Sequence, residues 1–393
     1  MGPAVTTRCC SALAVIALLA DATPPTLPFF PTRPIWSLAL NNPLAPESAP
    51  VFDGGRGFIP IAGDRLAAYD LKSGTMIWTV GAAPAMPLAA GGDLVFYPES
   101  GAIVALHADD GSAAWRLPFD RPLAVPPVWD NGWLVIATTD ARIVAISGAD
   151  GRIIWQRELN VAARARPALA ADRVYVPLAN ATVAALNVTT GEPVWQRRLG
   201  GDPTDILALD ERIYVGSTDH YLYCLEADTG DVGWRSMRTG AAVIGVPAYD
   251  DDRIYFVAFD NVLRAVSRRS GVQHWMKQLP LRPTSGPIRV GSTIIVSGNA
   301  AALPTYNAKD GSVLGTLAVA PEPAAPPTLV VDAASGQPQV MLVTGDIAKG
   351  ATVSLVARTA DPTPGTSIVP LTSAITTLPP LSLPGASAAR GQD

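Results

Sequence analysis

Histidines and carboxylates are the side chains in this chain that could bind a metal ion or transfer protons. The three histidines, His107, His220 and His274, fall at different positions of the repeat described below, so they predict no metal site. Several aspartates lie near predicted turns, where Asp commonly accepts hydrogen bonds from backbone N–H groups. These are Asp202, Asp205, Asp210, Asp250, Asp251 and Asp252. We therefore predict no catalytic, cofactor-binding or metal-binding residue.

Cysteines are the second set of residues that could do chemistry. Cys9 and Cys10 are adjacent, but they lie in an N-terminal segment that we expect to be removed. Cys224 then remains alone, so neither an internal disulfide nor a cysteine-based metal site is expected. Because other repeats carry Ala at its position, we interpret Cys224 as a small buried core residue.

Arginines on loops are the candidates for binding another protein, because a planar guanidinium can pair with carboxylates or backbone carbonyls. We expect four of them on the loops that enter the repeated units. These candidate partner-binding residues are Arg121, Arg164, Arg166 and Arg282. Further polar residues are expected behind them on the same face, namely Asp140, Arg142, Asp219, His220, Asp260 and Asn261. The alternative interpretation is ordinary solvated loop charge.

A repeat of about 40 residues must position all of these side chains. A short apolar run, a polar turn ending in Gly, and a strand with Trp four residues later recur along the chain. The turn glycines are Gly74, Gly111, Gly151, Gly191, Gly230, Gly271 and Gly311, with spacings from 37 to 41 residues. The tryptophans that follow them are Trp78, Trp115, Trp155, Trp195, Trp234 and Trp275. We expect each Gly to take a positive φ in the turn and each Trp to pack between neighbouring units.

The repeated unit predicts four short antiparallel strands, which form one blade of a propeller. In the clearest unit they cover residues 166–171, 173–177, 182–186 and 194–197. The seventh repeat carries Gly315 where Trp is expected, and a Pro-rich spacer at 321–327 follows it.

The two ends of the repeated region predict one shared blade. Three strands at 328–331, 339–344 and 351–358 lack a fourth strand, and residues 36–40, which begin with Trp36, lack the other three. We predict that these segments pair, which closes the ring and removes its open edges. The fold class is therefore all-β, an eight-bladed β-propeller of four-stranded antiparallel blades whose last blade is closed by an N-terminal strand.

Composition and the ends of the chain divide it into four segments. Residues 1–22 are expected to be a secretory signal peptide, 23–33 a Pro-rich segment, 34–358 the propeller, and 359–393 a disordered tail rich in Pro, Ser, Thr and Ala. The apolar run at 11–20 is too short to remain as a transmembrane helix. A net charge of -5 offers no basic surface for nucleic acid.

The unit Ala-Leu-x-x-x-[Thr/Asp/Ser]-Gly-x-x-x-Trp, as at 105–115 and 185–195, resembles the tryptophan-docking repeat of quinoprotein-type (PQQ-like) β-propellers. The resemblance covers residues 36–358. That family includes PQQ-dependent alcohol dehydrogenases and BamB-like proteins of bacterial outer-membrane assembly. Chain length and ring closure resemble the BamB-like branch, although a cysteine for lipid attachment is missing and the Pro-rich tail is unusual for that branch.

Resemblance to the dehydrogenases would imply PQQ on the propeller axis with calcium, a catalytic Asp, a disulfide between adjacent cysteines and a stacking Trp. The adjacent cysteines lie in the expected signal peptide, and no carboxylate cluster stands out. Trp129 and Trp133 are the tryptophans outside the repeat position after Trp36, and either could face the channel or pack in the core.

The sequence thus predicts a non-catalytic, exported propeller without a cofactor, in the periplasm or at the outer-membrane periphery of a bacterium. We expect a monomeric ring that acts as a protein-binding scaffold for another envelope protein. Two alternatives remain open. One is a PQQ- and calcium-dependent alcohol or sugar dehydrogenase, and the other is a small-ligand sensor that uses the axial channel.

Overall fold

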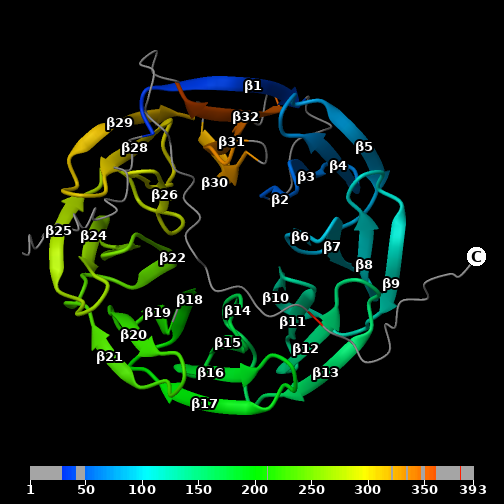
Figure 1. Ribbon diagram of the computed structural model, residues 1–393, viewed down its shortest axis with the longest axis horizontal. Helices are drawn as coiled ribbons and strands as arrows, with labels where there is room; N and C mark the ends of the chain where they lie inside the picture. Colours follow the sequence, from blue (N-terminus) through cyan, green and yellow to red (C-terminus); the bar gives the residue numbers. More distant parts are fainter. Residues whose placement is uncertain are drawn as a thin grey trace, which may run out of the picture.

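A computed structural model of the chain describes residues 29–40, 49–209, 211–319, 322–332, 335–346, 350–359 and 381. Its strands form eight four-stranded antiparallel sheets around a central axis (Figure 1). The predicted eight-bladed, all-β propeller is therefore confirmed. Among the residues described, no helix has the length and apolar composition needed to cross a membrane.

Seven blades each consist of four consecutive strands, ordered from the channel outward. Blade 1 contains β2 (Val51–Asp53), β3 (Arg56–Ile61), β4 (Arg65–Asp70) and β5 (Met76–Gly81), and blade 2 contains β6 (Ala89–Gly91), β7 (Leu94–Glu99), β8 (Ala102–His107) and β9 (Ala113–Pro118). Blade 3 contains β10 (Leu123–Asp130), β11 (Trp133–Thr138), β12 (Arg142–Ser147) and β13 (Ile153–Glu158), and blade 4 contains β14 (Ala168–Ala170), β15 (Arg173–Leu178), β16 (Thr182–Asn187) and β17 (Pro193–Arg198). Blade 5 contains β18 (Pro203–Leu209), β19 (Arg212–Ser217), β20 (Leu222–Glu226) and β21 (Val232–Arg235), and blade 6 contains β22 (Val243–Tyr249), β23 (Arg253–Ala258), β24 (Val262–Ser267) and β25 (Gln273–Gln278). Blade 7 contains β26 (Ile288–Val290), β27 (Thr293–Ile295), β28 (Ala302–Asn307) and β29 (Val313–Ala318).

Blade 8 joins the two ends of the repeated region, as predicted. Its strands are β30 (Glu322–Val331), β31 (Pro338–Asp346), β32 (Gly350–Arg358) and, on the outside, β1 (Thr32–Leu40). The predicted spacer at 321–327 is wrong for most of its length, because residues 322–327 belong to the innermost strand β30. Proline is tolerated there because one edge of an innermost strand faces the channel and needs no backbone N–H for pairing.

Neighbouring blades are locked together at the repeat turn. The seven turn glycines have φ between +69° and +74°. Each Trp indole donates to a backbone carbonyl in the turn of the next blade, as from Trp155 to Val188 at 2.6 Å and from Trp195 to Ala227 at 2.8 Å. Trp36 makes the same bond to Leu71 at 2.6 Å, which joins blade 8 to blade 1.

The core lies between the blades and is formed mainly by second and third strands. Tyr175, Tyr214 and Tyr255 of the second strands are fully buried, and their rings lie 5.8 to 5.9 Å from the tryptophan of the same blade. Cys224 is buried on β20 and pairs with Trp234. The residue at the same position of blade 4 is Ala185, which pairs with Trp195.

The segment before β1 contributes to the core. Phe29 is 2% exposed and its N–H donates to the Thr293 hydroxyl at 2.9 Å. Phe30 lies beside Gly315, which stands where blade 7 lacks its tryptophan. The expected signal peptide at 1–22 and most of the expected tail lie outside the described residues. Leu381 of that tail is described, and it packs against the core between blades 3 and 4.

Candidate functional site

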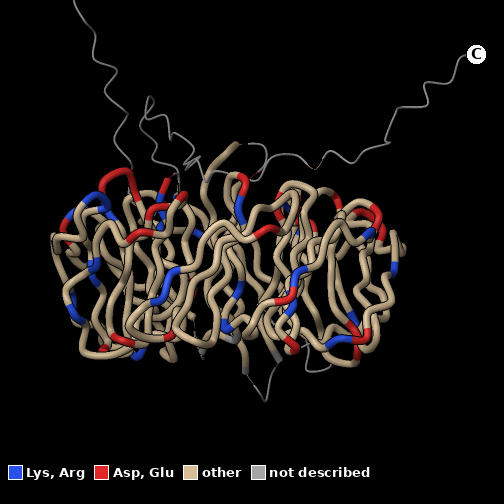
Figure 2. The backbone as a smooth tube through the Cα atoms, turned by 90° about the horizontal axis from the view of Figure 1, so that it is seen from below, with Lys and Arg blue, Asp and Glu red and all other residues tan. Residues whose placement is uncertain are grey.

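We call the side of the ring that carries the loops entering each blade, together with the loops between second and third strands, the loop face. The ring seen from the side is a disc whose charged residues gather mainly at the loops of its two faces (Figure 2). Of the four predicted arginines, Arg121 lies before β10, Arg164 and Arg166 before β14, and Arg282 before β26. They therefore enter blades 3, 4 and 7 and do not form one continuous patch.

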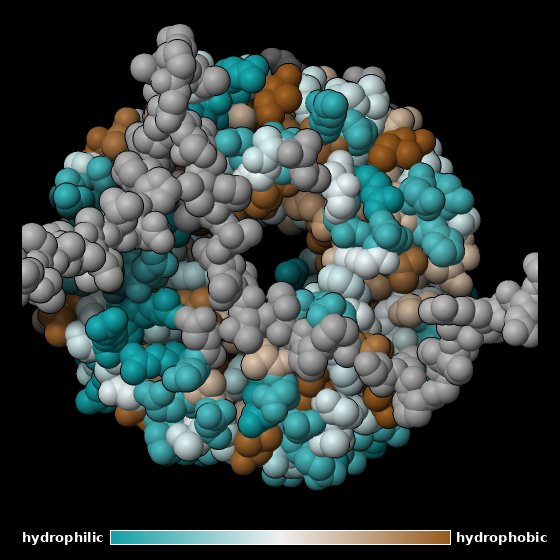
Figure 3. Space-filling model, in the orientation of Figure 1, coloured by the Kyte–Doolittle hydropathy of each residue, from teal (hydrophilic) through white to brown (hydrophobic). Residues whose placement is uncertain are grey.

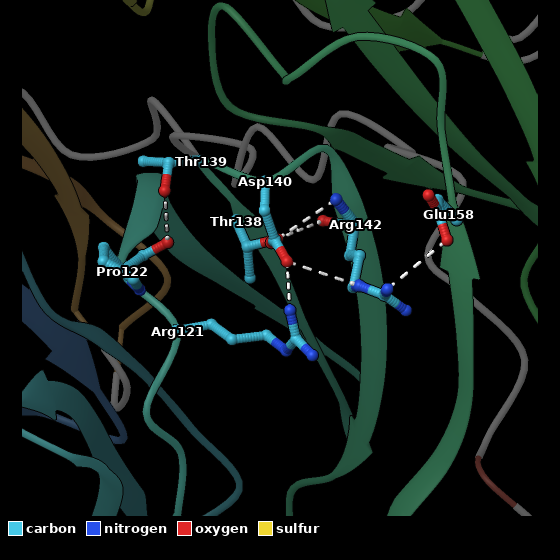
Figure 4. A network of polar contacts seen from close by, with 7 residues as sticks. All are labelled: Arg121, Pro122, Thr138, Thr139, Asp140, Arg142 and Glu158. Atoms are coloured by element: carbon cyan, nitrogen blue, oxygen red, sulfur yellow. Dashed lines mark hydrogen bonds and ion pairs between the residues drawn. The ribbon is translucent and has the colours of Figure 1, made fainter.

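Arg121 belongs to a charged network in blade 3 (Figure 4). Its guanidinium forms an ion pair with Asp140, which also accepts hydrogen bonds from the Thr138 hydroxyl and from Arg142 Nε at 3.4 Å. Arg142 in turn reaches Glu158 at 3.3 Å. The hydrogen bond from Thr138 and the charge of Arg121 lower the pKa of Asp140. Because every charge here has a partner, this network offers little unsatisfied charge to another protein.

Arg164 is also neutralised within the chain. Its Nη1 lies 3.1 Å from Asp202 Oδ2, which links the entering loops of blades 4 and 5. The other carboxylate oxygen of Asp202 accepts the Ala181 N–H at 3.0 Å. Both side chains remain partly exposed, so the pair is a surface ion pair of small net strength.

Arg282 differs from these two arginines because it lies on an aromatic ring. Its guanidinium carbon is 5.1 Å from the centre of the Phe259 ring, which is 44% exposed. The Phe259 N–H donates to the Ala242 carbonyl at the end of the loop that enters blade 6, at 3.0 Å. We call Phe259 and Arg282 the blade 6–7 surface. It combines an exposed aromatic side chain with a cation, which is typical of the centre of a protein interface.

Arg166 lies away from the other arginines and lines the axial channel. A central opening is visible in the space-filling view (Figure 3), and two cavities of about 620 and 780 Å³ extend along it. Both cavities are lined by Arg166, Asp205, Val246 and Leu329. Arg166 is exposed to the solvent of the channel, yet the surrounding walls displace enough water to lower its pKa. Burial raises the pKa of Asp205, against the opposing effect of the Arg166 charge.

Strand register places Arg166 and Asp205 at equivalent positions of adjacent blades. The second-strand tyrosines Tyr175, Tyr214 and Tyr255 pair with Ala168, Leu207 and Ala248 of the innermost strands. Two residues before these partners stand Arg166, Asp205 and Val246. By the same register Gly286 and Pro326 occupy this position in blades 7 and 8.

Prolines line the channel one residue further along the innermost strands. They are Pro50, Pro127, Pro167, Pro247, Pro287 and Pro327, while blade 2 has Leu88 and blade 5 has Ile206 at this position. Sequence reasoning missed the part that Asp205 plays in the channel, because it was interpreted as a turn residue. The spacing of these prolines, which is 40 residues between several of them, was the signal that could have aligned the inner strands and placed Asp205 beside Arg166.

The channel does not supply the donor set that calcium and PQQ would need. Calcium takes six to eight oxygen ligands, but among the described residues lining the two cavities Asp205 is the one carboxylate, and the nearby Arg166 charge would repel a cation. No three or more His, Cys, Asp or Glu side chains gather as a metal site within the described residues. Trp129 lines the channel-side cavity, whereas Trp133 is buried in the core.

The comparisons with known proteins agree with this fold. The family model described as outer membrane protein assembly factor BamB matches residues 31–124, 99–209 and 179–369. The solved structure of BamB from Moraxella catarrhalis is similar at 18% identity and a TM-score of 0.65, over 83% of this chain and 99% of that chain. A quinohemoprotein alcohol dehydrogenase from Pseudomonas putida HK5 is similar at 13% identity and a TM-score of 0.64, over 85% of this chain and 78% of that chain.

Two further results complete the comparisons. The computationally designed Ika8 protein is similar at 12% identity and a TM-score of 0.63, over 80% of this chain and 98% of that chain. No curated protein matches the chain. The predicted resemblance to PQQ-like propellers and to their BamB-like branch is confirmed, whereas structural likeness at such low identity shows a shared fold and leaves the activity open.

Proposed function

Because the chain belongs to the family of the outer membrane protein assembly factor BamB, we propose that it is a non-catalytic propeller that serves as a protein-binding scaffold in the bacterial envelope. The family match over most of the chain is the observation that carries this proposal. Its partner would be another envelope protein, reached after export directed by the segment at 1–22. The proposal requires no cofactor.

The blade 6–7 surface supports a binding role and suggests where the partner docks. Phe259 is exposed on the loop face of blade 6, and Arg282 lies over its ring. Aromatic residues and Arg are enriched at the energetic centres of interfaces because they bury much apolar area at a small entropic cost. Arg121 and Arg164, each paired with an aspartate, enter blades 3 and 4 and lie outside this surface.

The test is affinity capture of partners from an envelope extract, with chemical crosslinking and mass spectrometry. Phe259→Ser and Arg282→Glu should each lower recovery of the crosslinked envelope protein severalfold. Val313→Ser on β29 is the matched control, because Val313 is an exposed apolar residue of an outer strand. Equal recovery by all variants would refute the blade 6–7 surface, and crosslinks to no envelope protein would refute the scaffold function.

A PQQ- and calcium-dependent dehydrogenase is the second candidate, and likeness to a quinohemoprotein alcohol dehydrogenase favours it. The donor set of the channel argues against it, since Asp205 is the one carboxylate among the described residues that line the two cavities. The test is reconstitution of the purified protein with PQQ and calcium chloride. A quinone absorbance together with dye reduction by alcohols or aldose sugars would overturn the scaffold proposal.

A further inference from the structure

We propose that the axial channel binds a hydrophobic zwitterion, such as an apolar α-amino acid, with its carboxylate on Arg166 and its ammonium on Asp205. This inference concerns the channel and goes beyond the scaffold function, which uses the loop face. It rests on the cavities, on the placement of the two charges and on the apolar walls around them.

The channel has the size of a small-molecule site. Its two cavities of about 620 and 780 Å³ fall in the range of about 300 to 1,000 Å³ that is common for ligand pockets. They meet where Arg166 and Asp205 line both of them. A ligand held at this junction can therefore place an apolar substituent in either cavity.

The two charges line the same two cavities but do not form an ion pair within 4.0 Å. They occupy equivalent positions of blades 4 and 5, so they stand side by side around the channel. Each charge is partly desolvated, and neither has an oppositely charged side chain among the described residues within 4.0 Å, which is unfavourable for both. A group that carries an anion and a cation on neighbouring atoms would bridge the gap and satisfy both charges.

Asp205 is oriented for this role by the next blade. Its carboxylate accepts a hydrogen bond from the Gly245 N–H. Gly245 has a φ of +67° and packs so tightly that an added Cβ would lie 1.8 Å from the Gly286 nitrogen. The backbone that donates to Asp205 is therefore closely packed, and a carboxylate held in place by such a donor loses little freedom when a ligand binds.

The walls beside the charged pair are apolar and exposed. Val246, Leu329 and Val331 are 46%, 41% and 52% exposed, and all three line the larger cavity. An apolar substituent placed against them would remove this surface from water. Arg289 lines the same cavity near the end of β22, where its Nη1 donates to the Tyr249 carbonyl at 3.0 Å. A ligand with a carboxylate alone could pair with either Arg166 or Arg289. The ammonium group of a zwitterion can pair with Asp205, and this places the carboxylate on Arg166.

The test is isothermal titration calorimetry of the full chain with L-phenylalanine as the probe. Three control ligands each lack one feature: 3-phenylpropionate lacks the ammonium, phenethylamine lacks the carboxylate, and glycine lacks the apolar group. We expect phenylalanine to bind at least about tenfold more tightly than 3-phenylpropionate and phenethylamine, because each of them lacks one charge-assisted hydrogen bond to Arg166 or Asp205. We expect a similar factor of about ten over glycine, because glycine buries no apolar surface against the channel walls. Equal binding of phenylalanine and 3-phenylpropionate, or no measurable binding of phenylalanine, would overturn the proposal.

Variants of the chain locate the site. Arg166→Gln and Asp205→Asn should each weaken phenylalanine binding by about tenfold or more, since each removes one charge-assisted contact. Arg164→Gln is the matched control, because Arg164 lies near Arg166 in sequence but pairs with Asp202 outside the cavities. Unchanged affinity in both channel variants would refute the site. The control ligands are measured on the unmodified chain, so the test holds even if a variant folds poorly.

Discussion

Replacing Gly191 with Ala should destabilise the propeller through two separable effects. Gly191 has a φ of +69°, which costs an L-residue with a Cβ about 1 to 2 kcal/mol. The new methyl carbon would also lie 2.6 Å from the Trp155 indole of the preceding blade. Overpacking of that kind costs about 1 to 3 kcal/mol. The sum predicts that the free energy of unfolding falls by about 2 to 5 kcal/mol.

The structure provides a matched control for each effect. Gly63 has a φ of +86° but nothing within 4 Å of an added Cβ, so Gly63→Ala should show the backbone effect alone, about 1 to 2 kcal/mol. Gly81 has neither a positive φ nor a close neighbour, so Gly81→Ala should leave the stability nearly unchanged. Urea unfolding, followed by circular dichroism and tryptophan fluorescence, measures all three variants under the same conditions.

The comparison between Gly191→Ala and Gly63→Ala carries the test. If both lose the same free energy of unfolding, the methyl group meets no resistance from Trp155. The close packing of indole on glycine would then not be what joins the blades, and the positive φ alone would explain why Gly recurs in the turn. Loss of the bond from Trp155 Nε1 to the Val188 carbonyl is expected to accompany the larger effect.

Three further predictions concern ring closure, the thiol and acid stability. Deleting residues 29–40, which supply β1 and Phe29, should lower the urea midpoint far more than deleting residues 360–393, because only the first deletion removes a strand of blade 8. Equal midpoints would contradict the idea that closure of the ring by β1 stabilises the propeller. Cys224 is buried and its pKa is raised to about 12, so peptide mapping after iodoacetamide treatment in mildly alkaline buffer should find it unmodified in the native protein and alkylated in urea. Hydrogen bonds from the Ser73 hydroxyl and N–H lower the pKa of Asp70 below 3.8, so the ionised carboxylate stabilises the fold above that pH, and this stability is lost as the pH falls through the folded pKa. Ser73→Ala should therefore make the urea midpoint less sensitive to acid. An unchanged dependence of the midpoint on pH would count against this origin.

The fold could be predicted because its determinants are local and repeated. Six blades carry a turn glycine and a tryptophan within five residues, and a seventh carries the glycine alone, so this signal sets the seven internal blades and their register. Closure of the ring could be predicted because the three C-terminal strands lack a fourth strand of their blade, while the strand with Trp36 lacks the other three. The error at 322–327 arose because prolines usually interrupt strands, whereas an innermost strand of a propeller has one edge that needs no N–H.

The channel site could not be predicted from the same signals. The position of Asp205 beside Arg166 depends on the register between first and second strands in two blades, and the first strands carry no turn signal that fixes this register in the sequence. The partners of Arg121 and Arg164 were also missed. Those ion pairs join loops whose separation in the ring is set by blade packing and not by sequence distance.

Blades 4 and 5 carry Arg166 and Asp205 at the channel position where blades 6 and 7 have Val246 and Gly286. Six blades have proline before the paired residue of the inner strand, whereas blade 2 has Leu88 and blade 5 has Ile206 there. A charged residue in an apolar channel lowers stability unless something compensates it, and Arg166 comes no closer than the ion-pair limit. Two opposite charges that face the channel and do not pair with each other are suited to binding a ligand. Function in this ring should therefore be sought where one blade differs from its neighbours, first in the channel wall of blades 4 and 5.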